Sequence, residues 1–247
     1  MKKTPAFTLI ELLVVIAIIS LLLSILAPSL SRVKRLSEVT VCQSNLRQLQ
    51  FAYMGYSAQF RGRLLPYICD GARPDAFWME AIKPYYSGRG EVRCCPAVTR
   101  LEPSGCWGTA TTAWHGGGFI GGNYGSFGIS GWMYDMMSGR EDGRYNFPWN
   151  DLYDWESTGQ ITRPSSVPVW FDCNWVDAWP WHTDAPYPDL SMGSPGGYSS
   201  MGRICILRHD WSVNLAYADG TAHSVKLEEL WLQRWCSGYV PTVRTVP

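Results

Sequence analysis

The sequence predicts an α+β fold, in which one long N-terminal helix is followed by a C-terminal antiparallel β-sheet with loop-rich insertions. Three observations lead to this class. Residues 7–28 are almost wholly apolar, and a helical pattern of apolar side chains continues from there to residue 58. Residues 204–227 contain short runs typical of strands. The intervening stretch is rich in Gly and Pro, which mark turns and loops.

The composition argues against a nucleic-acid-binding protein and against a disordered chain. The 247 residues carry 21 Lys+Arg and 21 Asp+Glu, so the formal net charge is zero. A neutral chain without a basic block offers no electrostatic attraction to a phosphate backbone, and we expect no nucleic-acid partner. Aromatic residues make up 14% of the chain, including 13 Trp. Such a chain buries apolar surface and therefore contains a folded body.

The apolar segment of residues 7–28 is long enough to cross a hydrocarbon core of about 30 Å as a helix. We predict a single membrane span here. A removed secretory signal peptide is disfavoured, because the run is too long, no Ala-x-Ala site follows it, and the helical pattern continues past Pro28. Pro28 is expected to kink the helix, since proline cannot donate a backbone hydrogen bond.

Glu11 is the exceptional residue of the apolar segment. A carboxylate inside a membrane helix is costly and usually has a partner. Residues 4–31 contain no Lys or Arg that could neutralise it. We therefore expect the partner of Glu11 to lie on another molecule.

The string Ala-Phe-Thr-Leu-Ile-Glu at residues 6–11 resembles the start of type IV pilins and type II secretion pseudopilins. The resemblance implies that residues 1–6 are a leader peptide. A prepilin peptidase would cut between Ala6 and Phe7 and methylate the new amine of Phe7. Ala6 stands where these proteins usually have Gly.

The same resemblance implies where the chain lies and what its helix does. It implies a single-pass protein of the bacterial inner membrane with a cytoplasmic N-terminus, either in the membrane or in an assembled fibre. Residues 59–247 would form a periplasmic or extracellular head. Glu11 would meet the N-terminal amine of a neighbouring subunit, and Pro28 matches a kinking proline common in these proteins. The helix would thus join other pilin or pseudopilin subunits.

The function implied is that of a processed structural subunit of a type II secretion pseudopilus or a type IV pilus-like filament, which supports protein secretion or surface attachment. A head of this size is large for a shaft-forming subunit, which favours a minor one. The head could contact secreted cargo or a surface glycan. Two alternatives stay open: a membrane-tethered glycan- or protein-binding module, and a tethered hydrolase that uses His209.

The predicted helix covers residues 7–58, with its second half as the spine of the head, because apolar side chains recur there at three- and four-residue spacings. In the head, Asp219-Gly220 is predicted to form a tight turn between the last two strands. The expected short helices and strands are residues 78–85 and 228–235 as helices, and 124–130, 167–172, 204–208, 213–217 and 222–227 as strands.

His209, followed after nine residues by Asp219-Gly220, resembles the His-x9-Asp-Gly signature of a large pseudopilin-like bacterial family. The resemblance assigns no role to these residues. Further segments fit the same family, namely residues 42–48, Cys95-Pro96, residues 124–128 and Arg208-His209.

Eight cysteines lie beyond the membrane segment, on the side where disulfides persist. Eight cysteines allow more than a hundred pairings, so the connectivity is not determined by the sequence. We favour a disulfide between Cys42 and either Cys95 or Cys94. A zinc site is disfavoured, because the adjacent Cys94 and Cys95 have no nearby Cys-x2-Cys partner.

His209 has three possible roles. We favour a histidine that hydrogen-bonds at a strand end to order a hairpin. It could instead be a general base with Asp219 or Asp172, or a ligand in a His/Asp metal site. No hydrolase or phosphate-loop motif is present, so we expect no enzyme and no catalytic, cofactor or metal residues.

Calcium is an alternative, because major pseudopilins bind it near the carboxyl end. The aspartates that could supply oxygen ligands match no defined calcium loop. They are Asp172, Asp177, Asp184, Asp189, Asp210 and Asp219.

Nine tryptophans lie in Gly- and Pro-rich loops of the head. Burial is the favoured interpretation, since large rings can replace the regular structure that this region lacks. Exposed, they could stack on sugars or form a contact patch. They are Trp107, Trp114, Trp132, Trp149, Trp155, Trp170, Trp175, Trp179 and Trp181.

Overall fold

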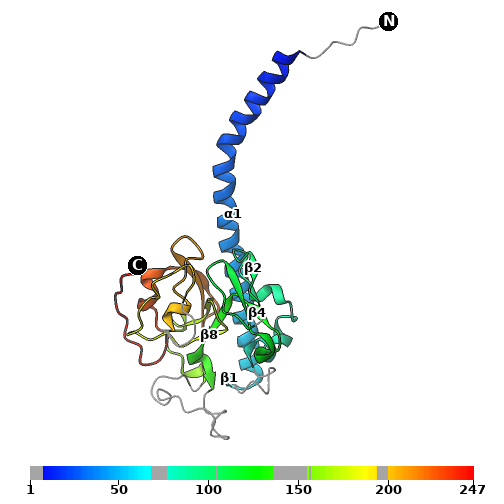
Figure 1. Ribbon diagram of the computed structural model, residues 1–247. Coiled ribbons are helices and arrows are strands. Elements are labelled where there is room, and N and C mark those ends of the chain that lie inside the picture. The colour runs from blue at the N-terminus through cyan, green and yellow to red at the C-terminus, as the bar shows by residue number, and fades with distance from the viewer. Residues whose placement is uncertain (1–7, 68–76, 104, 136–154, 156, 194–199) are drawn as a thin grey trace. The chain divides into compact units, whose positions relative to one another are not determined.

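The computed structural model describes residues 8–67, 77–103, 105–135, 155, 157–193 and 200–247. They fall into two compact units, residues 1–38 and residues 39–247. The second unit combines the end of a long helix with a mixed β-sheet and many short elements (Figure 1). The predicted α+β class is confirmed.

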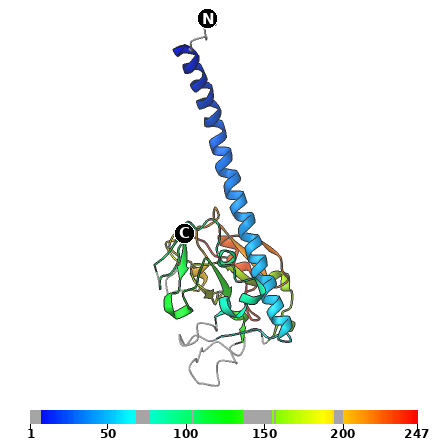
Figure 2. The ribbon, with the colours of Figure 1, turned by 90° about the vertical axis from the view of Figure 1, so that its right-hand side faces the viewer.

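The helix α1 (Leu9–Gln59) is continuous over 51 residues (Figure 2). It matches the predicted helix to within two residues at its start and one at its end. Pro28 lies inside it, so the proline does not end the helix, and the expected kink stays a prediction. The helix α1 is long and apolar enough to cross a membrane, and its most apolar stretch is not buried.

The main sheet has the strand order β10-β9-β7-β5-β8. Neighbouring strands are antiparallel except for β5 and β8, which run parallel. The expectation of a purely antiparallel sheet is therefore wrong at one edge. β7 lies on one side of β5. After β7 the chain passes to the other side of β5 and forms β8, which runs parallel to β5. The bounds are β5 Phe127–Ser130, β7 Pro168–Asp172, β8 Asp177–Ala178, β9 Ser212–Tyr217 and β10 Ala222–Lys226.

Two small sheets and several short helices complete the second unit. β1 pairs with β6, and β3 lies between β2 and β4. The strands are β1 Leu65–Pro66, β2 Arg100–Leu101, β3 Thr112–His115, β4 Tyr124–Gly125 and β6 Tyr134–Asp135. The helices are α2 Trp78–Ala81 and the 3-10 helices η2 Lys83–Tyr85, η3 Gly90–Arg93, η4 Gly117–Ile120, η5 Gly131–Met133, η7 Thr158–Gln160, η8 Pro164–Ser166, η9 Met201–Arg203 and η10 Leu227–Leu232.

Most predicted short elements are present with altered ends. The expected helix at residues 78–85 is formed by α2 and η2, and the expected strand at 124–130 by β4 and β5. Residues 167–172 correspond to β7. The expected terminal helix at 228–235 is shorter, because η10 ends at Leu232.

The expected strand at residues 204–208 is wrong. Both edges of β9 are occupied, by β7 on one side and β10 on the other, so this segment cannot pair with β9 in a hairpin. Its apolar side chains Ile204 and Ile206 are instead fully buried in the core. A run of buried apolar residues is compatible with a core loop as well as with a strand.

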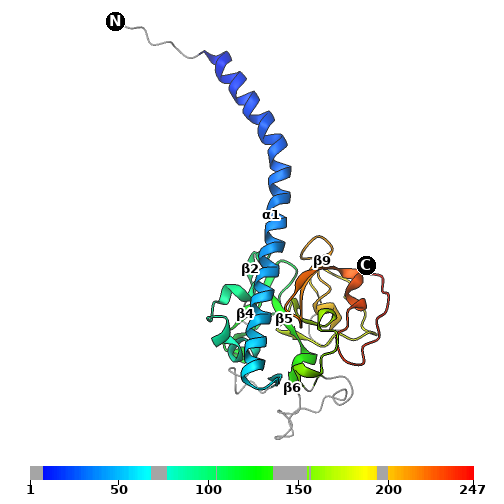
Figure 3. The same ribbon diagram turned by 180° about the vertical axis from the view of Figure 1, so that it is seen from behind.

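The later turns of α1 lie alongside the sheet (Figure 3). Its buried side chains include Leu46, Leu49 and Tyr53, which lie on one helix face. Tyr53 meets the edge of Trp170 at a ring distance of 6.3 Å, and Trp78 meets the same ring at 4.7 Å. Aromatic rings therefore fill the space between helix and sheet.

Where the structure describes the loop tryptophans they are buried or half-buried, so the prediction of burial holds fully for four of them. Trp149 lies outside the described residues. Four of the other eight are buried and four are half-buried. The buried ones are Trp114, Trp132, Trp155 and Trp170. The half-buried ones are Trp107, Trp175, Trp179 and Trp181.

Replacing Trp170 by Ala should destabilise the second unit by about 3–5 kcal/mol, because the ring is fully buried between α1 and the sheet. Trp211 is the matched control, since its side chain is 55% exposed. Trp211→Ala should change the free energy of unfolding by less than about 0.5 kcal/mol. Chemical denaturation of the detergent-solubilised chain measures both. Equal costs would show that Trp170 is not a core contact.

Candidate functional site

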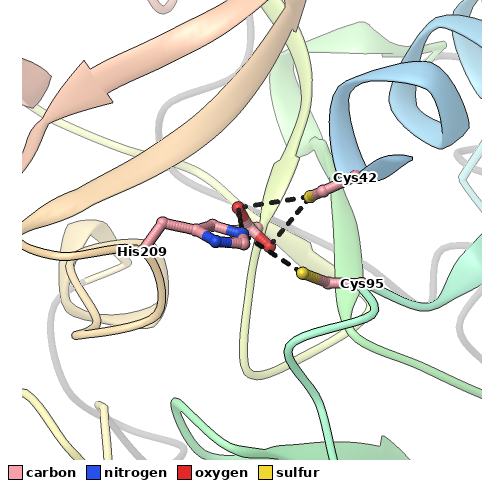
Figure 4. A group of neighbouring side chains, drawn as sticks. Cys42, Cys95 and His209 are labelled. Atoms are coloured by element: carbon pink, nitrogen blue, oxygen red, sulfur yellow. Dashed lines mark hydrogen bonds and ion pairs between the residues drawn. The ribbon is translucent and has the colours of Figure 1, made fainter. Parts of the chain in front are cut away.

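Four polar side chains from four separate segments meet inside the second unit (Figure 4). Their ligand-type atoms all lie within 4.8 Å of one another, and all four residues are buried. We call this group the buried cluster. It consists of Cys42, Cys95, Asp172 and His209.

Local structure explains how three of these side chains arrive. Cys42 lies on the buried face of α1, one turn before Leu46. Asp172 is the last residue of β7. Cys95 follows η3, where its backbone N–H donates a 2.6 Å hydrogen bond to the hydroxyl of Ser126. The helix, the sheet and a loop thus each contribute one group.

His209 reaches the cluster from a strained turn that leads into β9. Asp210 and Trp211 both have a positive φ, of 50° and 60°. The backbones of His209 and Ser212 bond each other in both directions at 3.1 Å. These backbone bonds hold His209 in the turn before β9, and its predicted role in ordering a hairpin stays a prediction. Its side chain contacts Cys95 and Asp172.

The distances within the cluster define its chemistry. His209 Nε2 lies 3.1 Å from Cys95 Sγ and 3.4 Å from Asp172 Oδ2. Cys42 Sγ lies 3.7 Å from each oxygen of Asp172. In a catalytic relay, the acid and the nucleophile contact opposite ring nitrogens of the histidine. Here both contact the same nitrogen, so the arrangement does not form a relay.

Arg208 holds Asp172 from the other side. Its Nη1 lies 3.1 Å from Asp172 Oδ1, and both side chains are fully buried. The guanidinium also donates to the backbone oxygens of Thr109, Ala110 and Ser126. A buried ion pair is tolerated when its remaining donors are satisfied in this way.

Opposing influences set the pKa values in the cluster. Burial raises the pKa of Asp172, but the charges of His209 and Arg208 outweigh it and lower it to about 2. Burial lowers the pKa of His209, whereas the carboxylate of Asp172 raises it to about 10. Burial raises the pKa of Cys95, and hydrogen bonds from Cys42 and His209 bring it down to about 7. Burial raises the pKa of Cys42 well above its usual range.

The His-x9-Asp-Gly spacing reflects the length of one strand. His209 lies before β9, and Asp219-Gly220 turns the chain from β9 into β10. Asp219 Oδ1 accepts hydrogen bonds from the backbone and hydroxyl of Thr221, and Gly220 has a φ of 91°. The predicted turn is confirmed. A six-residue strand spans roughly 20 Å, so Asp219 is not the partner of His209, and Asp172 is.

Side chains from the segments that carry the second resemblance surround the cluster. Asn45 donates to the backbone oxygen of Cys94 at 3.0 Å. Gln43 donates to the side chain of Asn214, whose backbone N–H donates to Asp172 Oδ2 at 2.8 Å. These residues connect α1 to the loop of the cluster cysteine and to β9.

The predicted partners Cys42 and Cys95 are brought together as free thiols. The disulfide between them stays a prediction. We expected no metal site from the sequence, and this group of four possible metal ligands was not predicted. Sequence reasoning named Asp172 and His209 as one possible pair and Cys42 and Cys95 as another, but it did not foresee that the two pairs meet or that Arg208 contacts Asp172. The four residues follow no local spacing that could have indicated the group.

Three of the aspartates considered for calcium have other contacts. Asp177 pairs with Arg203 at 3.5 Å. Asp184 accepts from the backbone of Trp181, and Asp189 accepts from Ser191. None of these three lies in the buried cluster.

In the first unit, Glu11 has a partner within its own chain. Its Oε2 accepts hydrogen bonds from the backbone N–H and the hydroxyl of Thr8, both at 2.8 Å. The backbone N–H of Glu11 donates to the hydroxyl of Thr8 at 3.3 Å. This is a capping box at the start of α1, and the Thr-x-x-Glu spacing is its sequence signal. The neighbour's amine stays a prediction, and Ala6 and Phe7 lie outside the described residues.

Residues 1–27 match the family model described as the prokaryotic N-terminal methylation motif. The motif is consistent with the type IV pilin and pseudopilin family, and it implies processing by prepilin peptidase and assembly with other pilin subunits. No curated protein and no solved structure matches the chain. The motif and the long apolar helix fit a membrane-anchored, pilin-like protein, and they favour a structural subunit over an enzyme.

Replacing Arg208 by Gln should destabilise the second unit by about 3–5 kcal/mol, because it removes the guanidinium that pairs with the buried carboxylate of Asp172 and leaves only His209 beside it. Lys83 provides the control, since its pair with Glu80 is exposed to solvent. Lys83→Gln should cost less than about 1 kcal/mol. Denaturant titration compares the two variants. A small cost for Arg208→Gln would contradict the assigned role of the buried pair.

Proposed function

We propose that the chain is a processed structural subunit, and a minor one, of a type II secretion pseudopilus or a type IV pilus-like filament. The observation that carries this proposal is the methylation motif at residues 1–27 on a helix whose apolar side chains are exposed. We place the chain in the bacterial inner membrane, with the leader in the cytoplasm and the head outside.

The exposed apolar surface of α1 supports assembly. The large apolar side chains of the first unit, such as Leu9 and Leu26, are 75% and 58% exposed. Soluble monomers rarely leave contiguous apolar surface of this extent in water. Lipid can cover it before assembly, and close packing against neighbouring helices can cover it afterwards.

Glu11 would serve two purposes in this proposal. Its bonds with Thr8 satisfy backbone and hydroxyl donors at the start of α1 and leave the carboxylate its charge. Inside a bundle of apolar helices, that charge would attract the amine of Phe7 on a neighbouring subunit, since each charge is costly there without the other. The pair would fix the register of the subunits.

The alternatives draw less support from the described residues. A glycan-binding surface would need exposed tryptophans, and the loop tryptophans that the structure describes are buried or half-buried. The geometry around His209 Nε2 does not provide the relay that a hydrolase of the triad type would need. We propose that the head contacts secreted cargo or a surface glycan as part of the filament.

Three variants separate the cap from the charge of Glu11. Glu11→Gln can keep the capping box but loses the charge, and Glu11→Ala loses both. Thr8→Ala keeps the charge and weakens the cap by about 1 kcal/mol. We expect both Glu11 variants to insert in the membrane but to be depleted at least tenfold from sheared filaments, whereas Thr8→Ala assembles nearly normally.

The measurement is the ratio of filament to membrane subunit by immunoblot, in cells that supply the assembly machinery. Mass spectrometry of the N-terminus, with methylated Phe7 expected, controls for processing. Normal assembly of Glu11→Gln would contradict the charge pairing. Retention of residues 1–6 in the wild-type chain would contradict the proposed function itself.

A further inference from the structure

We propose that the second unit binds one zinc ion through the four side chains of the buried cluster, namely Cys42, Cys95, Asp172 and His209. The proposal goes beyond a role in a filament, because it concerns how the folded body is held together.

The separations within the cluster suit a tetrahedral metal ion. Zinc lies about 2.3 Å from sulfur and about 2.0–2.2 Å from nitrogen or oxygen, so neighbouring ligand atoms are about 3.4–3.8 Å apart. The Cys42–Asp172 and His209–Asp172 atom pairs lie at 3.7 and 3.4 Å. The Cys95–His209 pair, at 3.1 Å, needs only a slight opening. These three separations are therefore close to those of a tetrahedral zinc site, and all four ligand atoms lie within 4.8 Å of one another.

Direct hydrogen bonds alone account poorly for the arrangement. His209 Nε2 carries at most one proton, yet it faces both Cys95 Sγ and Asp172 Oδ2. Cys42 Sγ is equidistant from the two carboxylate oxygens, and a thiol is a weak donor. All of these atoms point toward a common centre from different segments (Figure 4). A cation at that centre would satisfy them together.

The charges of the site balance with a divalent ion. Two thiolates and one carboxylate carry three negative charges, Zn²⁺ and the guanidinium of Arg208 carry three positive ones, and His209 would bind the ion as the neutral imidazole. Arg208 contacts Asp172 with both side chains fully buried. Buried charges are stable only when they are compensated nearby, so a neutral total suits this position.

Surrounding groups hold the ligands in place. Asp172 Oδ2 accepts the backbone N–H of Asn214 at 2.8 Å, and Oδ1 contacts Arg208. The backbone of Cys95 is fixed by the hydroxyl of Ser126. Hydrogen bonds that hold the metal-binding side chains in place are typical of protein metal sites.

The donor set selects the metal. Two thiolates and an imidazole favour zinc over calcium or magnesium, which prefer oxygen ligands. The carboxylate fits zinc better than Cu(I), which prefers soft ligands. All four side chains are buried, which indicates a closed structural site without an open position for substrate. The ion would fasten α1, β7, the Cys95 loop and the turn before β9 to one another.

The test uses the full chain, purified in detergent without chelator from cells grown with zinc. Elemental analysis should find about one zinc per chain, and X-ray absorption should show sulfur ligands at about 2.3 Å with lighter ligands at about 2.0–2.2 Å. Removal of the ion with a chelator should lower the Tm, and added Co²⁺ should then give the intense visible absorption of a tetrahedral thiolate site.

Adjacent cysteines supply a matched pair of variants. Cys95→Ser should lose most of the bound zinc, whereas Cys94→Ser, one position away and outside the cluster, should keep it. Because Cys95→Ser could fail to fold, the Co²⁺ spectrum of the wild-type chain decides independently. Wild-type protein without metal and with a Cys42–Cys95 disulfide would overturn the proposal. Equal zinc in the two variants, or another metal in place of zinc, would overturn it as well.

Discussion

The carboxylate of Asp172 is the point on which the second unit depends. It ends β7, receives the backbone of β9 at Asn214, and faces Arg208 and His209 from the segment that precedes β9. Cys42 brings α1 to the same carboxylate. A charge buried this deeply is stable only if each of these groups is in place, so helix, sheet and loops are constrained together.

The surfaces of α1 in the two units suit different surroundings. In the first unit, α1 exposes a continuous apolar surface that suits lipid or other helices. Polar side chains there form local hydrogen bonds, as Glu11 does with Thr8. In the second unit, the same helix presents one buried face to a core of aromatic rings. One element therefore serves as anchor and as spine, and its sequence pattern changes where its surroundings change.

Local signals made much of the fold predictable. The periodicity of residues 7–58 gives α1, and Asp219-Gly220 gives the hairpin turn. The segment 204–208 was mistaken for a strand because pairing is decided by distant partners, and β7 already occupies that edge of β9. Two pairs of the buried cluster, Cys42 with Cys95 and Asp172 with His209, were considered from the sequence, but their meeting was not predictable, since the four residues come from four separated segments. The Thr-x-x-Glu spacing of Thr8 and Glu11 indicates the capping box, whereas the cost of a charge in lipid indicates a partner on another molecule.

A double-mutant cycle on Asp172 and Arg208 tests most directly whether this carboxylate organises the second unit. The free energies of unfolding would be measured for Asp172→Asn, Arg208→Gln, the double variant and the wild-type chain, all in the same detergent. We predict a coupling energy of at least about 2 kcal/mol, since either single change breaks the buried ion pair between these two side chains. Single costs that add to the double cost within about 0.5 kcal/mol would contradict the account.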